Sequence, residues 1–165
     1  MRAADVIASI GTDDLEQFQH LLTSYLTESH ARCAVLVDRT GRLLAMRGDA
    51  GALDQVSFAS LAAADFAASD QLAELLGEEE FSSLYHHGER HSMYVADLAG
   101  WAILVTLFDR ATTLGMVRVK ARGIVPGFQQ AFAKLAERGP SGAVVPMEVG
   151  WADDAVSEID RLFTE

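Results

Sequence analysis

The sequence is poor in several features that would otherwise narrow its function. Its 165 residues include a single cysteine, Cys33, and only three prolines. One cysteine excludes an internal disulfide, and the N-terminus lacks a basic region followed by an apolar run and a cleavage site. We therefore expect a reducing compartment, most simply the cytoplasm. The longest apolar run, Trp101–Phe108, is far shorter than the roughly 20 residues that a helix needs to cross a bilayer.

Basic side chains are also scarce. The sequence has 13 lysines and arginines against 24 aspartates and glutamates, for a formal net charge of -11. Nucleic acids and anionic membrane surfaces are both bound mainly through clustered cations, and no basic cluster stands out here. We expect neither as a partner. Half of the residues are hydrophobic, which is enough to bury one core of ordinary domain size.

Common enzyme motifs are missing too. The phosphate-binding patterns G-x-x-x-x-G-K-[ST] and G-x-G-x-x-G do not occur, so the chain is not a nucleotide hydrolase by itself. The G-x-S-x-G elbow is absent, and Cys33 lies in an apolar stretch where a cysteine is usually an inert small hydrophobe. We expect no catalytic residue and no cofactor.

One polar cluster and one arginine leave alternatives open. The histidines and carboxylate of the segment 86–91 suit zinc by their chemistry: His86, His87, Glu89 and His91. The spacing matches no metal signature and adjacent strand residues point to opposite faces, so a polar turn that titrates near neutrality is favoured. Arg110 is either an arginine finger that reaches into a neighbour's nucleotide site or a solvated loop residue.

The first expected elements are a helix and a hairpin. Residues 12–14, Thr-Asp-Asp, provide capping oxygens and negative charge for an amphipathic helix that ends near Ser29. Residues 33–38 read as a buried strand. The turn at 38–41 contains a glycine and returns the chain into residues 43–46, which predicts a β-hairpin.

A second helix is expected from about Val56 to Leu76, with Gly77 as its C-terminal stop. Its apolar residues lie on one side: Phe58, Leu61, Leu72, Leu75 and Leu76. The opposite side carries small residues at helical spacing, where a solvated face usually has long charged ones: Ser60, Ala63, Ala64, Ala67 and Gln71. Helix propensity alone explains this stripe; alternatively, it is a shallow surface on which a partner lies closely.

Three strands and a third helix complete the expected domain. The strands span about 81–86, 92–97 and 101–108, and the helix about 116–137. Gly123 and the Pro126-Gly127 pair lie inside this helix, so either it is kinked or its first half is another element. Residues 139–150 form a linker rich in glycine and proline.

The last residues, 151–165, predict a short acidic amphipathic helix. Its apolar side chains recur at helical spacing: Val156, Ile159, Leu162 and Phe163. Isolated helices of about 12 to 15 residues are marginal in water, so this one needs an apolar groove. We expect it to bind a partner, with Ile159, Leu162 and Phe163 as anchors; packing on its own domain is the alternative.

Sequence and element order together resemble the roadblock family (dynein light chain 7 type). Within it, the resemblance is to bacterial regulators of cell polarity and gliding motility that act on an MglA-type, Ras-like small GTPase. The matching stretches are 35–43, 58–68, 72–77, 85–90, 103–109, 114–118 and 157–163. The likeness as a whole extends over most of residues 15–165, whereas residues 1–11 match nothing in the family.

The resemblance implies a roadblock-type α/β fold with the order α-β-β-α-β-β-β-α and a mixed or antiparallel five-stranded sheet. Residues 12–138 would form this domain, after an N-terminal extension (1–11) and before the linker (139–150) and the partner-binding helix (151–165). The resemblance also implies a homodimer in which the edge strands of the two copies pair. The long helices of the two copies, expected at about 56–76, would then lie side by side. Together these two helices would present the surface that binds one GTPase.

The implied activity is stimulation of GTP hydrolysis without a catalytic group from the regulator. Docking would rearrange the GTPase's own arginine and glutamine, and nucleotide exchange could be promoted as well. By position, the stripe formed by Ala63, Ala64, Ala67 and Gln71, with Ser60, falls on the partner-facing helix surface. A noncatalytic roadblock scaffold that recruits a GTPase or a polarity complex is the alternative. Either protein would be cytoplasmic, with a place at a cell pole.

Overall fold

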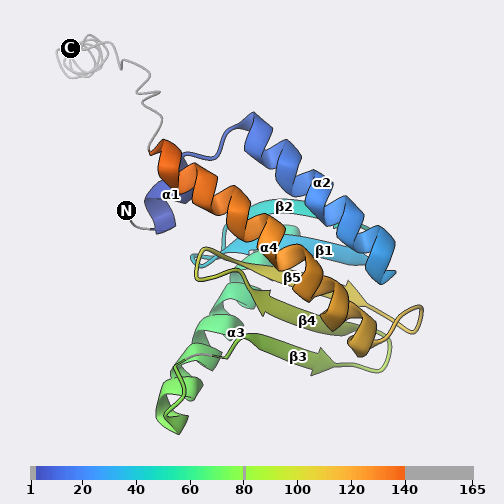
Figure 1. Cartoon of the computed structure of the whole chain (residues 1–165). Helices are drawn as coiled ribbons and strands as arrows, with labels where there is room; N and C mark the ends of the chain where they lie inside the picture. Colours follow the sequence, from blue (N-terminus) through green and yellow to red (C-terminus); the bar gives the residue numbers. More distant parts are fainter. Residues whose placement is uncertain (1–2, 80, 140–165) are drawn as a thin grey trace, which may run out of the picture.

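The computed structural model describes residues 3–79 and 81–139, whose arrangement is shown in Figure 1. In chain order the elements are α1 (Ala3–Ala8), α2 (Thr12–Ser29), β1 (Cys33–Asp38), β2 (Leu43–Gly48), α3 (Gln55–Leu76), β3 (Ser83–His87), β4 (Ser92–Asp97), β5 (Ala102–Phe108) and α4 (Leu114–Arg138). The five strands form one sheet in the order β2-β1-β5-β4-β3, and every neighbouring pair is antiparallel. This is the expected roadblock-type α/β architecture.

Helices cover both faces of the sheet (Figure 1). On one face α2 and α4 pack on each other, with the Phe18 ring 5.0 Å from the Phe132 ring and 6.0 Å from the Phe128 ring. Of the described helices, only α3 lies on the other face. Strands β1 and β5 are buried along almost their whole length because helices cover both of their faces, as an uninterrupted apolar strand predicts.

The β1–β2 hairpin and helices α3 and α4 begin and end close to the predicted residues. Helix α4 differs in one respect, because it runs without interruption through Gly123 and Pro126. The interpretation that its first half is another element is therefore wrong. Gly127 has a packing role here, since a Cβ on it would lie 3.1 Å from a methyl carbon of Leu21 in α2. Glycine thus allows the two helices to approach closely.

Helix α1 was not predicted from the sequence. Its Val6 is fully buried and Ile7 is 5% exposed, and Val6 belongs to the same apolar cluster as Phe18 and Phe132. Six residues offer too few turns for a periodic pattern to be recognised. The helix closes the end of the α2–α4 layer near the C-terminal end of α4 (Figure 1).

Two buried groups in the core share a hydrogen bond. The hydroxyls of Tyr25 in α2 and Thr106 in β5 lie 2.9 Å apart. Burial raises the pKa of Tyr25 to about 12, so its phenol keeps its proton. No helix among residues 3–79 and 81–139 is long and apolar enough to span a membrane.

Candidate partner-docking surface

Helix α3 is held on the sheet by its small residues. The side chains that face the sheet are all buried: Ala59, Ala62, Ala63, Phe66, Ser69 and Ala73. They pack on Val35 and Val37 of β1, among other residues of the sheet. Alanines let the helix axis approach the strands closely, and Phe66 is the one large side chain of α3 that is fully buried in this contact.

Local signals set both ends of α3. The Asp54 side chain accepts hydrogen bonds from the Ser57 backbone N–H at 3.3 Å and from the Ser57 hydroxyl at 2.6 Å. These bonds lower the pKa of Asp54, as expected for a carboxylate at a helix N-terminus. Gly77 ends the helix in the left-handed conformation, with φ +77°.

Arg39, in the turn between β1 and β2, fastens α3 to the sheet. Its guanidinium bonds Asp70 of α3 at 3.1 Å and Asp97 of β4 at 3.0 Å. Its Cζ also lies 4.6 Å from the centre of the Phe66 ring, within cation–π range. In the same turn, a Cβ on Gly41 would lie 3.0 Å from the Ser60 Cα, so the glycine lets the turn touch the helix.

Replacing Arg39 by alanine should therefore lower the free energy of unfolding by about 2 kcal/mol, since it removes a charge-assisted hydrogen bond to Asp70 and an ion pair with Asp97 at a half-buried site. Urea unfolding followed by circular dichroism measures the loss. The matched control is Arg42→Ala, because Arg42 is exposed in the same hairpin and forms no ion pair among the described residues. Equal, small losses for both variants would contradict the role given to Arg39.

The predicted stripe is only partly a surface. Ser60, Ala64, Ala67 and Gln71 are exposed and follow one another at helical spacing along the outer side of α3. We call these four residues the small-residue face. The fifth, Ala63, is 7% exposed and packs toward the sheet with Ala59 and Ala62. No long side chain projects from the small-residue face except that of Gln71.

The leucines of α3 do not face the core, contrary to the sequence interpretation of that side. Leu61, Leu72, Leu75 and Leu76 are 56–83% exposed, and only Phe58 is partly buried. Leu61, Leu72 and Leu76 align on one flank of the helix, and we call them the leucine row. Asp65 lies in the same row by its spacing. Large exposed apolar patches are typical of surfaces that bind other proteins.

The leucine row runs beside the free edge of the sheet. The Asp65 carboxylate lies 2.7 Å from Nε2 of His86 in β3, so this flank of α3 is the one nearest to that strand. Strand β3 pairs with β4 on one side only, and β3 ends the sheet. An exposed strand edge next to an apolar helix flank is a template for pairing with another chain.

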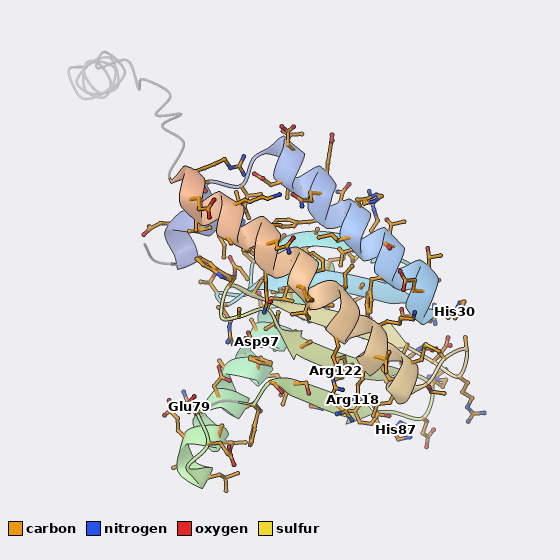
Figure 2. All side chains as sticks on the ribbon, viewed as in Figure 1. His30, Glu79, His87, Asp97, Arg118 and Arg122 are labelled. Atoms are coloured by element: carbon orange, nitrogen blue, oxygen red, sulfur yellow. The ribbon has the colours of Figure 1, made fainter. Side chains whose placement is uncertain are left out.

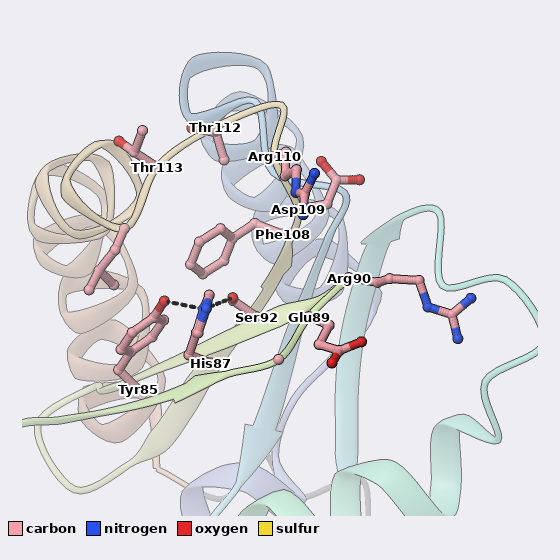
Figure 3. Close-up of a pocket in the computed structure, with 12 residues that line it drawn as sticks. Tyr85, His87, Glu89, Arg90, Ser92, Phe108, Asp109, Arg110, Thr112 and Thr113 are labelled. Atoms are coloured by element: carbon pink, nitrogen blue, oxygen red, sulfur yellow. Dashed lines mark hydrogen bonds between the residues drawn. The ribbon is translucent and has the colours of Figure 1, made fainter.

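The histidine cluster does not converge. His86 points toward α3, whereas Nδ1 of the neighbouring His87 lies 3.0 Å from the Tyr85 hydroxyl and 3.1 Å from the Ser92 hydroxyl (Figure 3). His91 lines a separate pocket beside Asp49. In the part of the chain that the structure describes, no three or more His, Cys, Asp or Glu side chains are grouped to hold a metal ion. Successive side chains of a strand point to opposite faces of the sheet, so the neighbouring histidines of β3 do not meet.

Arg110 lines a cavity of about 430 Å³ at the end of β5, together with Tyr85, His87 and Phe108. Figure 3 shows it in the loop that leads to α4. The Arg110 side chain is exposed and forms no ion pair among residues 3–79 and 81–139.

Cys33 is fully buried in β1. Burial, and to a lesser degree the charge of Asp49, raise the pKa of its thiol to about 11. A thiol is nucleophilic only as its thiolate, so this one is inert at neutral pH. The proposed anchors Ile159, Leu162 and Phe163 lie outside the described residues.

Comparisons with known proteins agree with this geometry. The model of the Roadblock/LC7 domain family matches residues 17–108. Among solved structures, Myxococcus xanthus MglB is 29% identical with a TM-score of 0.72, and the gliding protein MglB of Thermus thermophilus is 30% identical with a TM-score of 0.71. Each alignment covers 76% of this chain and 95% of the other. A Roadblock/LC7 domain from Streptomyces avermitilis, 14% identical with a TM-score of 0.64, shares the fold. Among curated proteins no sequence matches significantly.

Proposed function

The chain belongs to the Roadblock/LC7 family, and we propose from this premise that it regulates an MglA-type, Ras-like small GTPase by docking onto it. The likeness to two bacterial MglB proteins, which extends over three quarters of this chain, supports the choice of partner. We further propose that the protein acts in the cytoplasm, in bacterial cell polarity or motility, and that it stimulates GTP hydrolysis.

The observation that carries the proposal is the outer side of α3. It combines a small-residue face with a leucine row on a helix that the sheet and Arg39 hold rigidly. Small side chains let a partner's backbone approach closely, and a rigid helix does not lose conformational entropy when the partner binds. A surface of this kind binds another protein and offers no reacting group.

The proposed active unit is a homodimer. Pairing of two β3 edges would extend the sheet across both subunits, and the two leucine rows would then cover each other. The small-residue faces of both α3 helices would form one continuous surface for a single GTPase. The Ser60, Ala64, Ala67 and Gln71 side chains would be the contact residues on each copy.

Stimulation would come from rearrangement of the partner. Hydrolysis of GTP needs a positioned water and a cation that stabilises the charge on the transferred phosphoryl group. We propose that docking places the GTPase's own glutamine and arginine for these roles. Arg110 then remains a solvated residue of this chain.

GTP turnover by the cognate MglA-type protein, measured with and without this chain, tests the proposal. We expect turnover to rise with the concentration of the chain until the GTPase is saturated, and binding measured in parallel to saturate at the same concentration. Unchanged turnover despite tight binding would leave only the scaffold function. Absence of binding to any MglA-type GTPase would contradict both functions.

A separate prediction concerns the C-terminal segment. Replacing Ile159 and Phe163 by aspartate should weaken the GTPase complex about tenfold or alter nucleotide exchange, because apolar anchors of a helix in a groove carry much of its binding energy. The thermal midpoint should change little. Titration calorimetry and a thermal scan measure the two effects. A large loss of stability with unchanged binding would show instead that this segment belongs to the core.

A further inference from the structure

A groove lies on the α4 side of the sheet, where α4 leaves part of β4 and all of β3 uncovered (Figure 1). The groove holds a cavity of about 310 Å³ between β4 and α4. Tyr94 and Ala96 of β4, with Ala121 and Val125 of α4, provide its apolar part. Beyond the end of the cavity the exposed ring of Tyr85 continues the apolar surface, stacked on Phe108 at 6.2 Å.

Two arginines overhang this groove. Arg118 and Arg122 stand one turn apart on α4, line the cavity, and extend toward β3 (Figure 2). Neither forms an ion pair within residues 3–79 and 81–139, although Lys120 between them bonds Glu28 at 3.1 Å. The carboxylate nearest to them in the groove, that of Asp97, bonds Arg39 instead. The groove therefore offers two uncompensated cations in a chain whose net charge is -11.

We propose that this groove is the docking site of the chain's own C-terminal segment, residues 151–165, when no GTPase is bound. The inference goes beyond the proposed function, because it concerns the free protein and holds whichever partner the protein serves. The segment would lie along α4 with its apolar side chains on the groove and its carboxylates against Arg118 and Arg122.

Charge complementarity supports this occupant. Residues 139–165 contain six acidic side chains and one basic one, Arg161. Helix α4 has the opposite balance, with five basic side chains and one acidic one. Asp153 and Asp154 stand at the start of the segment and Glu158 one turn later, a spacing close to that of Arg118 and Arg122 along α4. Opposite charges at matched spacing favour one register of docking.

Chain length also permits it. Helix α4 ends at Arg138, and the distance back to Arg122 along the helix is about 25 Å at 1.5 Å per residue. The linker, residues 139–150, spans up to about 40 Å when extended. Attachment to the same chain raises the effective concentration of the segment at the groove, so even weak contacts suffice for occupancy.

The test is carried out on the free protein with all of residues 1–165. A nitroxide attached to Ser157→Cys reports on nearby amides, while Cys33 is buried and does not react. We expect the amide signals of Ser83, Tyr94 and Arg122 to lose most of their intensity, and those of Glu16 and His20 on the exposed side of α2 to keep theirs. Intensity lost at α2 instead, or at no described residue, would overturn the proposal.

Charge variants decide whether the arginines hold the segment. Arg122→Glu should restore the lost signals, and adding Asp154→Arg to it should remove them again. The matched control is Lys134→Glu, an equal charge change at an exposed lysine elsewhere on α4. This variant should lose the same amide signals as the parent protein. Identical patterns for Arg122→Glu and Lys134→Glu would overturn the proposed contact.

Mixing nitroxide-labelled protein of natural isotope content with unlabelled ¹⁵N protein separates docking within a chain from docking between chains. Docking within a chain leaves the Ser83 and Arg122 signals intact in such mixtures, whereas their loss in the mixtures would place the segment on another copy and overturn the assignment to the same chain. Because no GTPase is present in these experiments, their failure would leave the proposed function untouched.

Discussion

Replacing Ala67 by arginine should weaken GTPase binding more than about 100-fold, or about 3 kcal/mol, and abolish the stimulation of hydrolysis. Ala67 lies in the middle of the small-residue face, and its methyl group leaves room for a partner's backbone. A long cationic side chain there would hold the two surfaces apart. Arginine is nearly as good a helix former as alanine, so α3 itself should stay folded.

A matched substitution separates loss of docking from loss of fold. Ala133→Arg makes the same change at an exposed alanine of α4, on the opposite side of the sheet from α3, and should leave binding unchanged. Gln71→Glu, at the end of the small-residue face, should weaken binding as well. Normal binding by both Ala67→Arg and Gln71→Glu would mean that these residues are only a favourable helix sequence.

Replacing Leu61 and Leu72 by aspartate should convert a dimer into monomers at micromolar concentration. In a twofold interface each substitution occurs twice, so losing the buried leucines and adding unpaired charges should cost at least about 4 kcal/mol. The monomer should remain folded, because both leucines are more than half exposed within one chain. Sedimentation velocity measures the mass, and circular dichroism verifies the fold.

The control for this variant is Val119→Asp, which changes a similarly exposed apolar residue on α4. It should leave the dimer intact because it lies on the other face of the sheet from the leucine row. A parent protein that is itself monomeric at micromolar concentration would contradict the proposed dimer. Dissociation by Val119→Asp but not by the leucine variant would place the interface on the α2–α4 side.

Most of the fold is predictable because its signals are local. Asp54 and Gly77 mark the two ends of α3 by hydrogen bonding and backbone conformation, and both are readable in the sequence. The apolar run of β5 likewise indicates a strand buried on both faces. Helix α4 was harder to predict from the sequence, because a proline such as Pro126 usually interrupts a helix. Packing of Phe128 and Phe132 beyond the proline outweighs the roughly 3 kcal/mol that a proline costs in a helix.

The orientation of α3 could not be read from hydrophobicity. Leucines suggest a buried side, yet the helix turns alanines to the sheet because small residues allow the closest approach. The leucine row is exposed in the single chain, which is why we propose it as an interface, and periodicity does not distinguish a core from an interface. The presence of Asp65 among the leucines is the one sequence signal against a core, because a lone carboxylate is seldom buried.

The stripe proposed for docking was only in part placed correctly on the surface. Periodicity identified Ser60, Ala64, Ala67 and Gln71 as one stripe, and these four are exposed. Ala63 falls in the same pattern but faces the sheet, since a stripe of small residues spans the border between the packed and the exposed side. The role of Arg39 was missed, because its partners Asp70 and Asp97 are brought together only by the tertiary fold.

The most direct test of the account is single-turnover GTP hydrolysis by the MglA-type GTPase with saturating chain, either the parent protein or the variant Arg110→Ala. We expect the parent protein and Arg110→Ala to accelerate hydrolysis equally, because the reacting groups belong to the GTPase and this chain only docks. Acceleration that disappears in Arg110→Ala, while binding is unchanged, would show that the chain lends a catalytic arginine. No acceleration by either protein would contradict the stimulation of hydrolysis itself.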